Sequence, residues 1–392
     1  MIARKLWRLF LYLVKTKKTW RWPRVSDVLI YDAQGHESLL EFLSPWNPEV
    51  LHVRGEQLSI PILLTSLPGF ARLNRSAYID RFVRTVRPRL IVTYTDNDPS
   101  FYSLATRHKN ITTLLIQNGI RTIYGHVFEH LDPASSARSG FKVDYMMMFG
   151  RHIGDQYARF IQGSTVPVGS LVNNSVPRRK ATTPGTLAYV SQYRESQREE
   201  IDGRVFTRAE YYEQADRLVL TSLIRYAREH GKTFSIIACS NIHSNRQRYD
   251  REKRYYRDLL GHDCDVLRES DQYAGYDAVD ATEVVVALES TLGYESAARG
   301  NKTAFFCMRL EPWGMPGQKF GWPGGYADDG PFWTNRQDPD AFDRILDYLF
   351  SITDEEWQVQ LKQQGFDDIM AYDPGNTVLR SVLRQELGPP PS

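Results

Sequence analysis

The stretch that decides the fold is VVVALESTLGYESAARGNKTAFF, residues 284–306. It begins with a short apolar run, Val284–Leu288, without polar alternation, which is typical of a parallel strand covered on both faces. A Ser-Thr-x-Gly sequence then opens a helix, and a second apolar run follows at Thr303–Phe306. This strand–helix–strand order predicts a parallel sheet with helices packed on it.

The same alternation extends from this stretch toward both ends of the chain. In the second half we expect further strands at Leu187–Val190, Phe234–Ala238 and Asp265–Leu267, and a long amphipathic helix at Ala209–His230 stopped by Gly231. In the first half we expect strands at Asp27–Tyr31, Glu49–Val53, Leu90–Tyr94, Thr113–Ile116 and Tyr145–Phe149, with helices at Ala77–Val86 and Ile153–Ile161. The predicted fold class is α/β, with two doubly wound Rossmann-like domains facing across a cleft.

Periodicity is lost in NNSVPRRKATTPG, residues 173–185, where two prolines stand among polar residues. We therefore expect a first Rossmann-like domain over residues 25–172, a linker over 173–185 and a second Rossmann-like domain over 186–340. Residues 341–392 are expected to form closing helices. Thr353, with Glu356 three residues later, predicts a capping box at the start of one of these helices.

Composition limits the possible functions. The chain has 392 residues, 42% hydrophobic and 24% charged, which suits two domains of ordinary size. The cysteines stand alone at Cys239, Cys264 and Cys307, which favours a reducing, cytoplasmic compartment over a disulfide framework or a zinc site. The motifs of P-loop and dinucleotide-binding proteins, of serine hydrolases and of zinc proteases are absent from the sequence.

The N-terminal segment, residues 1–24, contains eight Lys or Arg residues and no acid. Ile2, Leu6, Leu9 and Leu13 recur there at helical spacing, which predicts a basic amphipathic helix lying on an anionic membrane surface. The alternative is a helix docked on the protein's own body. The rest of the chain has more acidic than basic residues, so we expect no nucleic-acid partner.

The junction between the strand and the helix of the opening stretch predicts a donor site. Ser290, Thr291, Leu292 and Gly293 lie where backbone N–H groups at a helix start can bind a nucleotide phosphate. Glu295, one turn later, is expected to be exposed in the empty cleft and to accept hydrogen bonds from a ribose. The alternative is a helix cap with tight packing at the glycine.

Carboxylates follow two other strands. Asp96 and Asp98 stand in an Asp-x-Asp spacing, and we interpret them as candidate general bases without assigning a metal. Glu195 is a candidate base or nucleophile that we expect to point into the interdomain cleft, together with Arg194, which would pair with an acidic sugar. Helix capping by Asp98 and solvated loop charge are the alternatives.

Further candidates for substrate contact lie at strand ends and in one aromatic loop. They are Arg54 and Glu56, then Gln117, Asn118 and Arg121, and finally Trp322 and Trp333 in a block rich in Gly and Pro. The arginines would pair with anionic groups of donor or acceptor, and the tryptophans would form a lid or platform against a sugar or base. Solvated charge, an ordinary Asn-Gly turn and plain packing between domains are the alternatives.

Six segments together resemble bacterial surface-carbohydrate biosynthesis proteins. They are DVLIYDAQGHESLL (27–40), HVRGEQLSIPILL (52–64), YTDNDPSFY (94–102), IQNGIRT (116–122), ESTLGYESAARGNKTAFF (289–306) and GWPGGYADDGPFWTN (321–335). ESTLGYESAARG also resembles the donor-side motif of two-domain (GT-B) glycosyltransferases. Within that group the chain is similar to enzymes of lipopolysaccharide and capsule assembly, among them retaining β-Kdo transferases that use CMP-Kdo.

The resemblance implies a GT-B fold, with the donor nucleotide held mainly by the second domain, the acceptor mainly by the first, and no obligatory metal or cofactor. It places Gln192 and Ser240 near the donor. Capsule-type Kdo enzymes carry an aspartate directly after that Gln, where this chain has Tyr193-Arg194-Glu195, and a His-Pro pair where it has Cys239-Ser240. The nucleophile is therefore not carried over.

The function expected from these observations is sugar transfer from a nucleotide-activated donor, CMP-Kdo, to a lipid-linked surface oligosaccharide. The enzyme is expected to be cytoplasmic and peripheral to the anionic inner membrane. The alternatives are transfer of a polyol phosphate during surface polymer synthesis and a non-catalytic glycan-binding scaffold.

Overall fold

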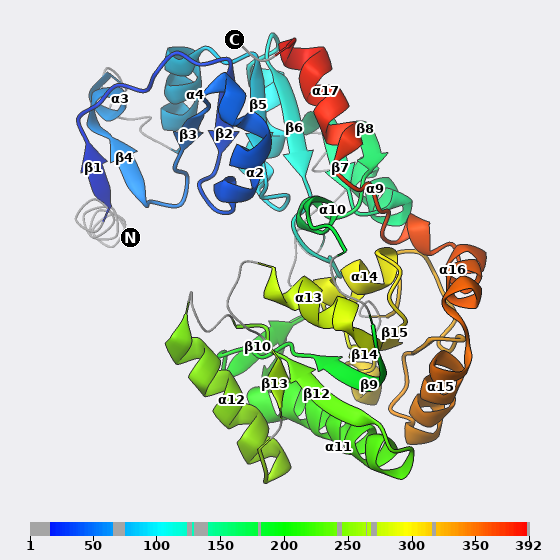
Figure 1. Ribbon diagram of the computed structural model, residues 1–392. Coiled ribbons are helices and arrows are strands. Elements are labelled where there is room, and N and C mark those ends of the chain that lie inside the picture. Colours follow the sequence, from blue (N-terminus) through cyan, green and yellow to red (C-terminus); the bar gives the residue numbers. More distant parts are fainter. Residues whose placement is uncertain are drawn as a thin grey trace.

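The computed structural model describes residues 16–65, 75–123, 128, 140–178, 182–240, 245–263, 265–267, 273–315 and 319–389. Within them the chain forms two domains, each built on a six-stranded sheet whose neighbouring strands are all parallel (Figure 1). The predicted α/β class with two doubly wound Rossmann-like domains is confirmed. The helix expected in the N-terminal segment lies largely in residues 1–15, outside the described residues.

The first domain has the strand order β3-β2-β5-β6-β7-β8. Its strands are β2 (Val28–Tyr31), β3 (Glu49–Leu51), β5 (Leu90–Thr93), β6 (Thr112–Ile116), β7 (Lys142–Met148) and β8 (Gln162–Pro167). Its helices are α2 (His36–Leu43), α4 (Arg75–Val86), α5 (Pro99–Tyr102), α6 (Leu104–Arg107), α9 (Arg151–Ala158) and α10 (Leu171–Ser175), with a 3-10 turn, η1 (Ser44–Trp46).

Both faces of this first sheet are covered, which explains why its strands show no polar alternation. Val28 and Ile30 pack on one face with apolar residues of α2 and of the C-terminal helix. Leu29 and Tyr31, which point the other way, pack with apolar residues of α4. Every residue of β2 is therefore fully buried.

The second domain has the strand order β13-β12-β9-β14-β15-β16. Its strands are β9 (Thr183–Val190), β12 (Thr233–Ile237), β13 (Val266–Leu267), β14 (Thr282–Ala287), β15 (Thr303–Phe306) and β16 (Trp333–Thr334). Its helices are α11 (Gln214–Glu229, after a π turn at Ala209–Glu213), α12 (Arg246–Leu260), α13 (Ala274–Ala281), α14 (Thr291–Ala298), α15 (Pro339–Ser351) and α16 (Asp354–Gln363), with 3-10 turns η4 (Glu311–Trp313) and η5 (Phe366–Asp368).

The strand order fixes where a ligand can bind. In the second sheet the order reverses between β9 and β14, so the loops after these two strands diverge and leave a crevice. Helices α13 and α14 lie on the side of the second domain that faces the first (Figure 1). The predicted capping box is present at the start of α16, formed by Thr353 and Glu356.

Two small pairs of strands lie outside the main sheets. β1 (Lys17–Thr19) pairs with β4 (Gln57–Ser59), which continues into α3 (Ile60–Thr65). β10 (Arg198–Ile201) and β11 (Arg204–Thr207) form an antiparallel hairpin. These pairs were not predicted from the sequence, because each strand is only three or four residues long and largely polar.

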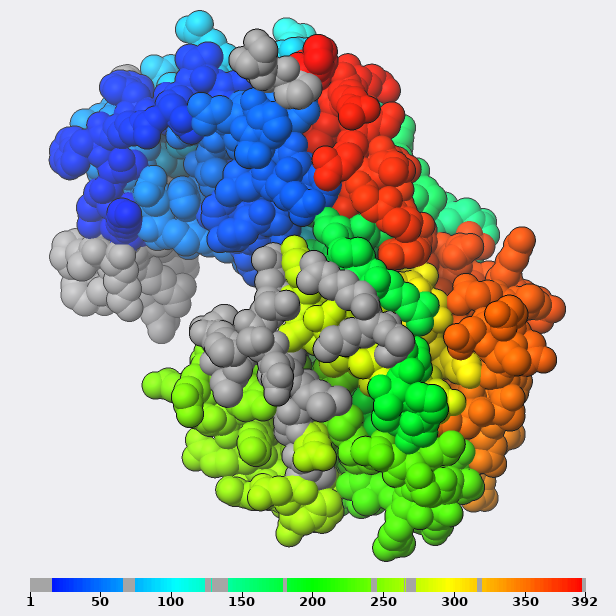
Figure 2. Space-filling view, in the orientation of Figure 1, coloured from blue at the N-terminus to red at the C-terminus, as the bar shows by residue number. Residues whose placement is uncertain are grey.

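The chain crosses between the domains twice. The interval 173–185 contains less irregular structure than expected, because Asn173–Ser175 belong to α10 and β9 starts at Thr183. After α16 the chain returns, and α17 (Thr377–Leu387) packs on the first sheet through Leu379, Leu383 and Leu387. In Figure 2 this red segment lies against the blue and cyan first domain.

The two crossings are joined by hydrogen bonds. The Asn174 side chain donates to the Val168 carbonyl at 2.8 Å and to Asn376 Oδ1 at 3.1 Å, and its backbone carbonyl accepts from Gly375 at 2.8 Å. Asn174 is buried, so these bonds satisfy polar groups that would otherwise be costly to remove from water. Asn174, which was expected to lie in a linker, is thus part of the folded structure. Among the described residues, no helix is both long and apolar enough to cross a membrane.

Candidate functional site

A cleft of ≈ 500 Å³ lies between the domains, at the carboxyl ends of the strands. The first domain contributes the loop after β6, and the second domain contributes the loops after β9, β12, β14 and β15 and the β10–β11 hairpin. The lining residues are Gly119, Ile120, Arg121, Thr122, Ser191, Gln192, Arg194, Glu199, Glu200, Ile201, Tyr211, Tyr212, Cys239, Glu289, Ser290, Thr291 and Arg309. The cleft therefore brings together five residues that were predicted from the sequence: Arg121, Gln192, Arg194, Ser290 and Thr291.

The start of α14 is held tightly between the domains. Gly293 packs against β14, since a Cβ added there would lie 2.3 Å from the Cβ of Ala287. Thr291 Oγ1 accepts a hydrogen bond at 3.1 Å from the backbone N–H of Ile120 in the first domain. Ser290 is the N-cap residue, makes no side-chain cap bond and lines the cleft. Leu292 packs against the core. The glycine therefore serves packing, as the alternative interpretation held. The first residues of the helix face the cleft, and phosphate binding by them stays a prediction.

Glu295 is not placed as expected. Its side chain is buried, with 5% exposure, and the Tyr276 hydroxyl is hydrogen-bonded to it. Its backbone carbonyl accepts from the Asn173 amide at 3.4 Å. The expectation of an exposed carboxylate in the cleft is therefore wrong. Glu295 follows Gly293 by two residues, which places it on the face of α14 away from the strand, and α13 covers it there through Tyr276.

A buried arginine forms the floor of the cleft. Arg309 is 4% exposed, donates through Nη1 to Gln192 Oε1 at 2.9 Å and to Glu289 Oε2 at 3.1 Å, and through Nη2 to Asp216 Oδ1 at 3.1 Å. Its Nε is buried and has no partner among the described residues. Buried donors are rarely left unpaired, so this Nε is available to a water or a ligand that accepts from it.

Glu289 is the first residue after β14 and lines the cleft beside this arginine. Its Oε2 is paired with Arg309, whereas its Oε1 is buried and has no hydrogen-bond partner among the described residues. Burial raises the pKa of the Glu289 carboxyl above its ordinary value, and the nearby Arg309 opposes this shift. Neither residue was singled out from sequence. The available signal was position, because Glu289 directly follows a strand and Arg309 follows the next strand by three residues.

A second buried carboxylate shapes the loops after β9 and β12. Glu252, fully buried on α12, accepts from the backbone N–H groups of Cys239 at 2.8 Å and Ser240 at 2.9 Å and from the Ser191 hydroxyl. Ser240 is itself buried and is not among the residues that line the cleft, whereas Cys239 is. Ser240 therefore positions the loop through its backbone.

The three predicted catalytic acids are engaged elsewhere. Asp96 is fully buried in an ion pair with Arg121 and accepts from the Tyr157 hydroxyl at 2.8 Å. Asp98 caps α5 at 2.9 Å, as its alternative interpretation held, and pairs with Arg75 at 2.8 Å. Glu195 pairs with Arg251 at 2.7 Å on the surface and is not among the residues lining the cleft, which contradicts its expected orientation.

The loop after β6 is rigidly built around two predicted residues. Gln117 accepts from the Phe149 N–H at 2.8 Å and donates to the Gly119 carbonyl at 2.9 Å. Arg121 donates to Asp96 at 2.8 Å and to the Asn118 side chain at 2.6 Å. Residues 119–122 of this fixed loop line the cleft, with the Arg121 guanidinium held by Asp96, and Gln117 and Arg121 also line a smaller hollow beside it.

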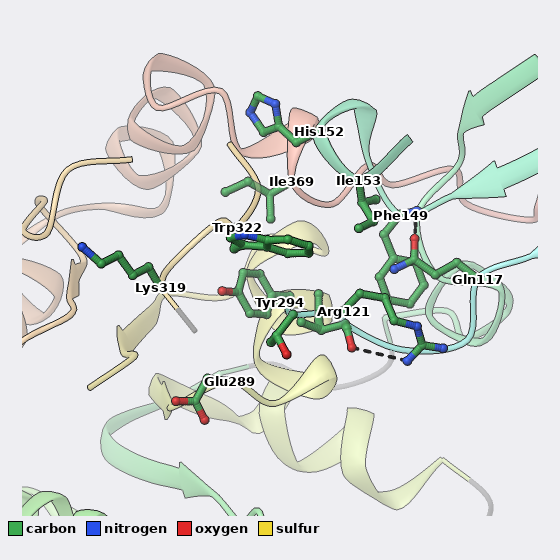
Figure 3. A pocket seen from close by; sticks show the side chains of 12 residues that line it. Gln117, Arg121, Phe149, His152, Ile153, Glu289, Tyr294, Lys319, Trp322 and Ile369 are labelled. Atoms are coloured by element: carbon green, nitrogen blue, oxygen red, sulfur yellow. Dashed lines mark hydrogen bonds between the residues drawn. The ribbon is translucent and has the colours of Figure 1, made fainter. Parts of the chain in front are cut away.

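That smaller hollow, of ≈ 20 Å³, has room for about one water molecule. In Figure 3, Trp322 lies between Tyr294 and Ile369, and Phe149 of the first domain lies to one side of it. Trp333, by contrast, is 3% exposed and stacks on Phe320 with ring centroids 4.5 Å apart. Of the two tryptophans expected to form a lid or platform, Trp333 is therefore buried and Trp322 lines the hollow.

Arg54 and Glu56 do not line the cleft. Arg54 donates through Nε to Asp32 at 2.7 Å, and its backbone N–H donates to Glu56 at 3.2 Å. Both side chains stabilise the loop after β3. Among the described residues, no three His, Cys, Asp or Glu side chains group as metal ligands would.

Comparison with known proteins identifies the family. A family model described as "putative O-antigen biosynthesis protein" matches residues 114–387. The chain belongs to this family. The match runs from β6 to the end of α17 and includes the whole second sheet, and it confirms the resemblance to surface-carbohydrate biosynthesis proteins. No curated protein matches the chain by sequence.

Solved structures share the fold of this O-antigen biosynthesis family member. A glycosyltransferase from Rickettsia africae ESF-5 matches with a TM-score of 0.50 and 11% identity, over 95% of this chain and 99% of that chain. A UDP-GlcNAc 2-epimerase from Neisseria meningitidis, bound to UDP-GlcNAc, matches with a TM-score of 0.51 and 11% identity, over 92% of this chain and 91% of that chain. These likenesses confirm the two-domain GT-B architecture.

Proposed function

We propose that this protein is a glycosyltransferase that moves a sugar from a nucleotide-activated donor to a bacterial surface glycan. The observation that carries the proposal is the unpaired Arg309 Nε at the floor of a cleft that also contains the start of α14. A donor phosphate would accept from Arg309 and from N–H groups at the helix start, which lack intrahelical partners. Membership of an O-antigen biosynthesis family supports a surface glycan as the product.

The second domain would hold the donor and the first the acceptor, as in the GT-B enzymes that the sequence resembles. Gln192, Ser290, Thr291 and Arg309 would surround the nucleotide phosphate. The exposed Arg194, on the second-domain side of the cleft, would meet anionic groups of acceptor or donor, whereas the guanidinium of Arg121 is already paired with Asp96. We propose CMP-Kdo as the donor and a lipid-linked oligosaccharide as the acceptor, on the strength of the sequence resemblance.

A lipid-linked acceptor requires the enzyme to work at the membrane. The described end of the N-terminal segment supports contact with an anionic surface, since Trp20 is 75% exposed, Trp22 is 51% exposed, and exposed Lys17 and Lys18 lie beside them. Exposed tryptophan rings are favoured at the headgroup level of a bilayer, and cations are attracted by anionic lipids. We therefore place the protein at the cytoplasmic face of the inner membrane.

The donor class can be tested by thermal shift with CMP, CDP, UDP, GDP and their sugars, a CDP-polyol included. A ligand that binds only the native protein raises its stability by about 2.7 kcal/mol at a hundredfold excess over Kd. The panel should give one preferred nucleotide, and CMP-Kdo is the expected donor. Stabilisation by the CDP-polyol alone would favour polyol-phosphate transfer, whereas no stabilisation by any member would favour a scaffold.

A variant distinguishes phosphate binding from general loss of structure. Arg309→Lys keeps the charge next to Glu289 and Asp216 but loses the Nε donor and the fixed fork of the two Nη groups. Binding of the preferred nucleotide should weaken by about tenfold, a loss of about 1.4 kcal/mol, which is within the range for a hydrogen bond to a charged group. Binding of the matching nucleoside, which has no phosphate, should be unchanged.

A further inference from the structure

The three carboxylates predicted from the sequence to be catalytic are all engaged outside the cleft. Asp96 is sealed by Arg121 and Tyr157, Asp98 caps a helix, and Glu195 lies outside the cleft. Transfer to a hydroxyl group nevertheless requires a group that accepts its proton. The remaining candidates are acids that line the cleft itself.

Three carboxylates line the cleft among the described residues. Glu199 and Glu200 belong to the β10–β11 hairpin, and Glu199 accepts from the Tyr212 hydroxyl at 2.8 Å. Glu289, at the end of β14, lines both the cleft and the small hollow that it shares with the first domain. It therefore lies where the donor site of one domain meets the acceptor side of the other, across from Arg121 (Figure 3).

The two oxygens of Glu289 have different surroundings. Oε2 is held by Arg309 Nη1 at 3.1 Å, which fixes the carboxyl group in place. Oε1 is buried and has no hydrogen-bond partner among the described residues. A buried acceptor without a partner costs about 1–3 kcal/mol, so a substrate hydroxyl that donates to Oε1 would remove that cost.

We propose that Glu289 is the catalytic base, an inference that rests on the proposed transferase function. The acceptor hydroxyl oxygen forms a bond to the anomeric carbon of the donor sugar while its proton passes to Glu289 Oε1. The bond from that carbon to the donor phosphate breaks, and the electron pair leaves on the phosphate oxygen. Arg309, paired to the other carboxylate oxygen, lies beside both developing charges.

The surroundings of Glu289 suit this role. Arg309 and Cys307 after β15, Asp216 on α11 and Tyr294 on α14 are the titratable groups that interact with it. Burial raises the pKa of the Glu289 carboxyl, which makes the carboxylate a stronger base than a solvated glutamate. The base works deprotonated, so the rate should rise with pH through this raised pKa and fall below it.

Asp216 provides a matched control. Like Glu289, it pairs with Arg309, at 3.1 Å, but it is 1% exposed and is not among the residues that line the cleft. Glu289→Gln and Asp216→Asn each remove one negative charge from the same arginine. If the Asn variant does not fold, Glu289→Asp is the second comparison, because it shortens the base while keeping its charge.

The experiment uses the full chain and the nucleotide sugar that binds best in the thermal-shift panel. Kd is measured by calorimetry, and release of free nucleotide is followed under single-turnover conditions, with water or a membrane lipid extract as acceptor. Glu289→Gln should keep Kd within about threefold, since the base acts in the transition state. It should slow nucleotide release by about 10²–10⁴-fold and remove the acid limb of the pH profile, whereas Asp216→Asn should stay within about tenfold of wild type.

Each outcome has one meaning. Absence of binding by wild type to every nucleotide sugar contradicts the proposed function itself. Binding by wild type, with equal nucleotide release by wild type and Glu289→Gln, including no release by either, overturns the assignment of the base. An equal slowing by Glu289→Gln and Asp216→Asn also overturns it, because the effect would then pass through Arg309.

Discussion

The Thr291 hydroxyl of the second domain accepts a hydrogen bond at 3.1 Å from the backbone N–H of Ile120 in the first. The bond joins the start of α14 to the loop after β6, and both segments line the cleft. The two domains are therefore in direct contact at the edge of the cleft.

Loss of this contact should loosen the loop without unfolding either domain. Thr291→Val keeps the shape of the side chain but removes the acceptor, so the Ile120 amide should exchange its hydrogen faster. A typical hydrogen bond contributes about 0.5–1.5 kcal/mol, which corresponds to about 2–12-fold faster exchange. Ser290→Ala is the control, because that hydroxyl makes no cap bond. Unchanged exchange in peptides covering residues 117–123 would contradict the contact.

Glu295 should matter for stability rather than for direct ligand contact. It is buried against the Tyr276 hydroxyl, so Glu295→Ala leaves that hydroxyl unpaired and should lower the free energy of unfolding by about 1–3 kcal/mol. Glu295→Gln retains an acceptor and should cost less. Urea unfolding of both variants measures the difference. A Glu295→Ala protein as stable as wild type but unable to bind nucleotide would show that the residue contacts the ligand.

The Asp96–Arg121 pair should behave as a coupled structural unit. Both side chains are buried, at 0% and 8% exposure, so removal of one partner leaves an uncompensated charge and should cost about 3–5 kcal/mol. Asp96→Ala with Arg121→Met in one chain should destabilise less than the sum of the single variants. A double-mutant cycle in urea tests this. Additive effects would mean that the two residues act independently.

Membrane contact should depend on the exposed residues of the N-terminal segment. Each cation near an anionic surface contributes about 1 kcal/mol, so Lys17→Gln with Lys18→Gln should weaken binding by about 2 kcal/mol, or about 30-fold, at low salt. Trp20→Ala with Trp22→Ala should also weaken it. Sedimentation with vesicles of phosphatidylcholine and phosphatidylglycerol measures the loss.

The control for that experiment is Val205→Ala with Val359→Ala, which removes exposed apolar groups at 58% and 55% exposure elsewhere on the surface. Vesicle binding should be unaffected by this pair. Equal binding by wild type, the lysine pair and the tryptophan pair would contradict the proposed membrane surface.

The fold was predictable because the central strands of both main sheets contain continuous apolar runs. Val284–Leu288 and Leu90–Tyr94 need helices on both faces, and only a doubly wound sheet provides them. β8 and β16 were missed for physical reasons: Gln162–Pro167 is a polar, largely exposed edge strand, and β16 has two residues. Amino-acid composition and hydrophobic periodicity give no signal for edge strands that are polar or only two residues long.

The loops that line the site could be predicted from the sequence, but the pairing of their side chains could not. Because Gln192, Arg194 and Ser290 follow strands, they were correctly predicted to lie at the cleft. It could not show which carboxylates are already paired, because Asp96 finds Arg121 twenty-five residues away and Asp98 finds Arg75 on another helix. Sequence position likewise could not show that Arg309 and Glu289 keep one unpaired atom each.

The return of the last helix to the first domain means that the two domains are not two separable pieces of the gene. A fragment that ends before Thr377 would expose the surface that Leu379, Leu383 and Leu387 cover, next to Val28, Ile30 and Leu90. Such a fragment should aggregate, and a peptide of residues 377–387 supplied in trans should restore its solubility. Conversely, an exchange of first domains between family members must include α17, because otherwise the α17 helix of one protein would have to pack on the sheet of another.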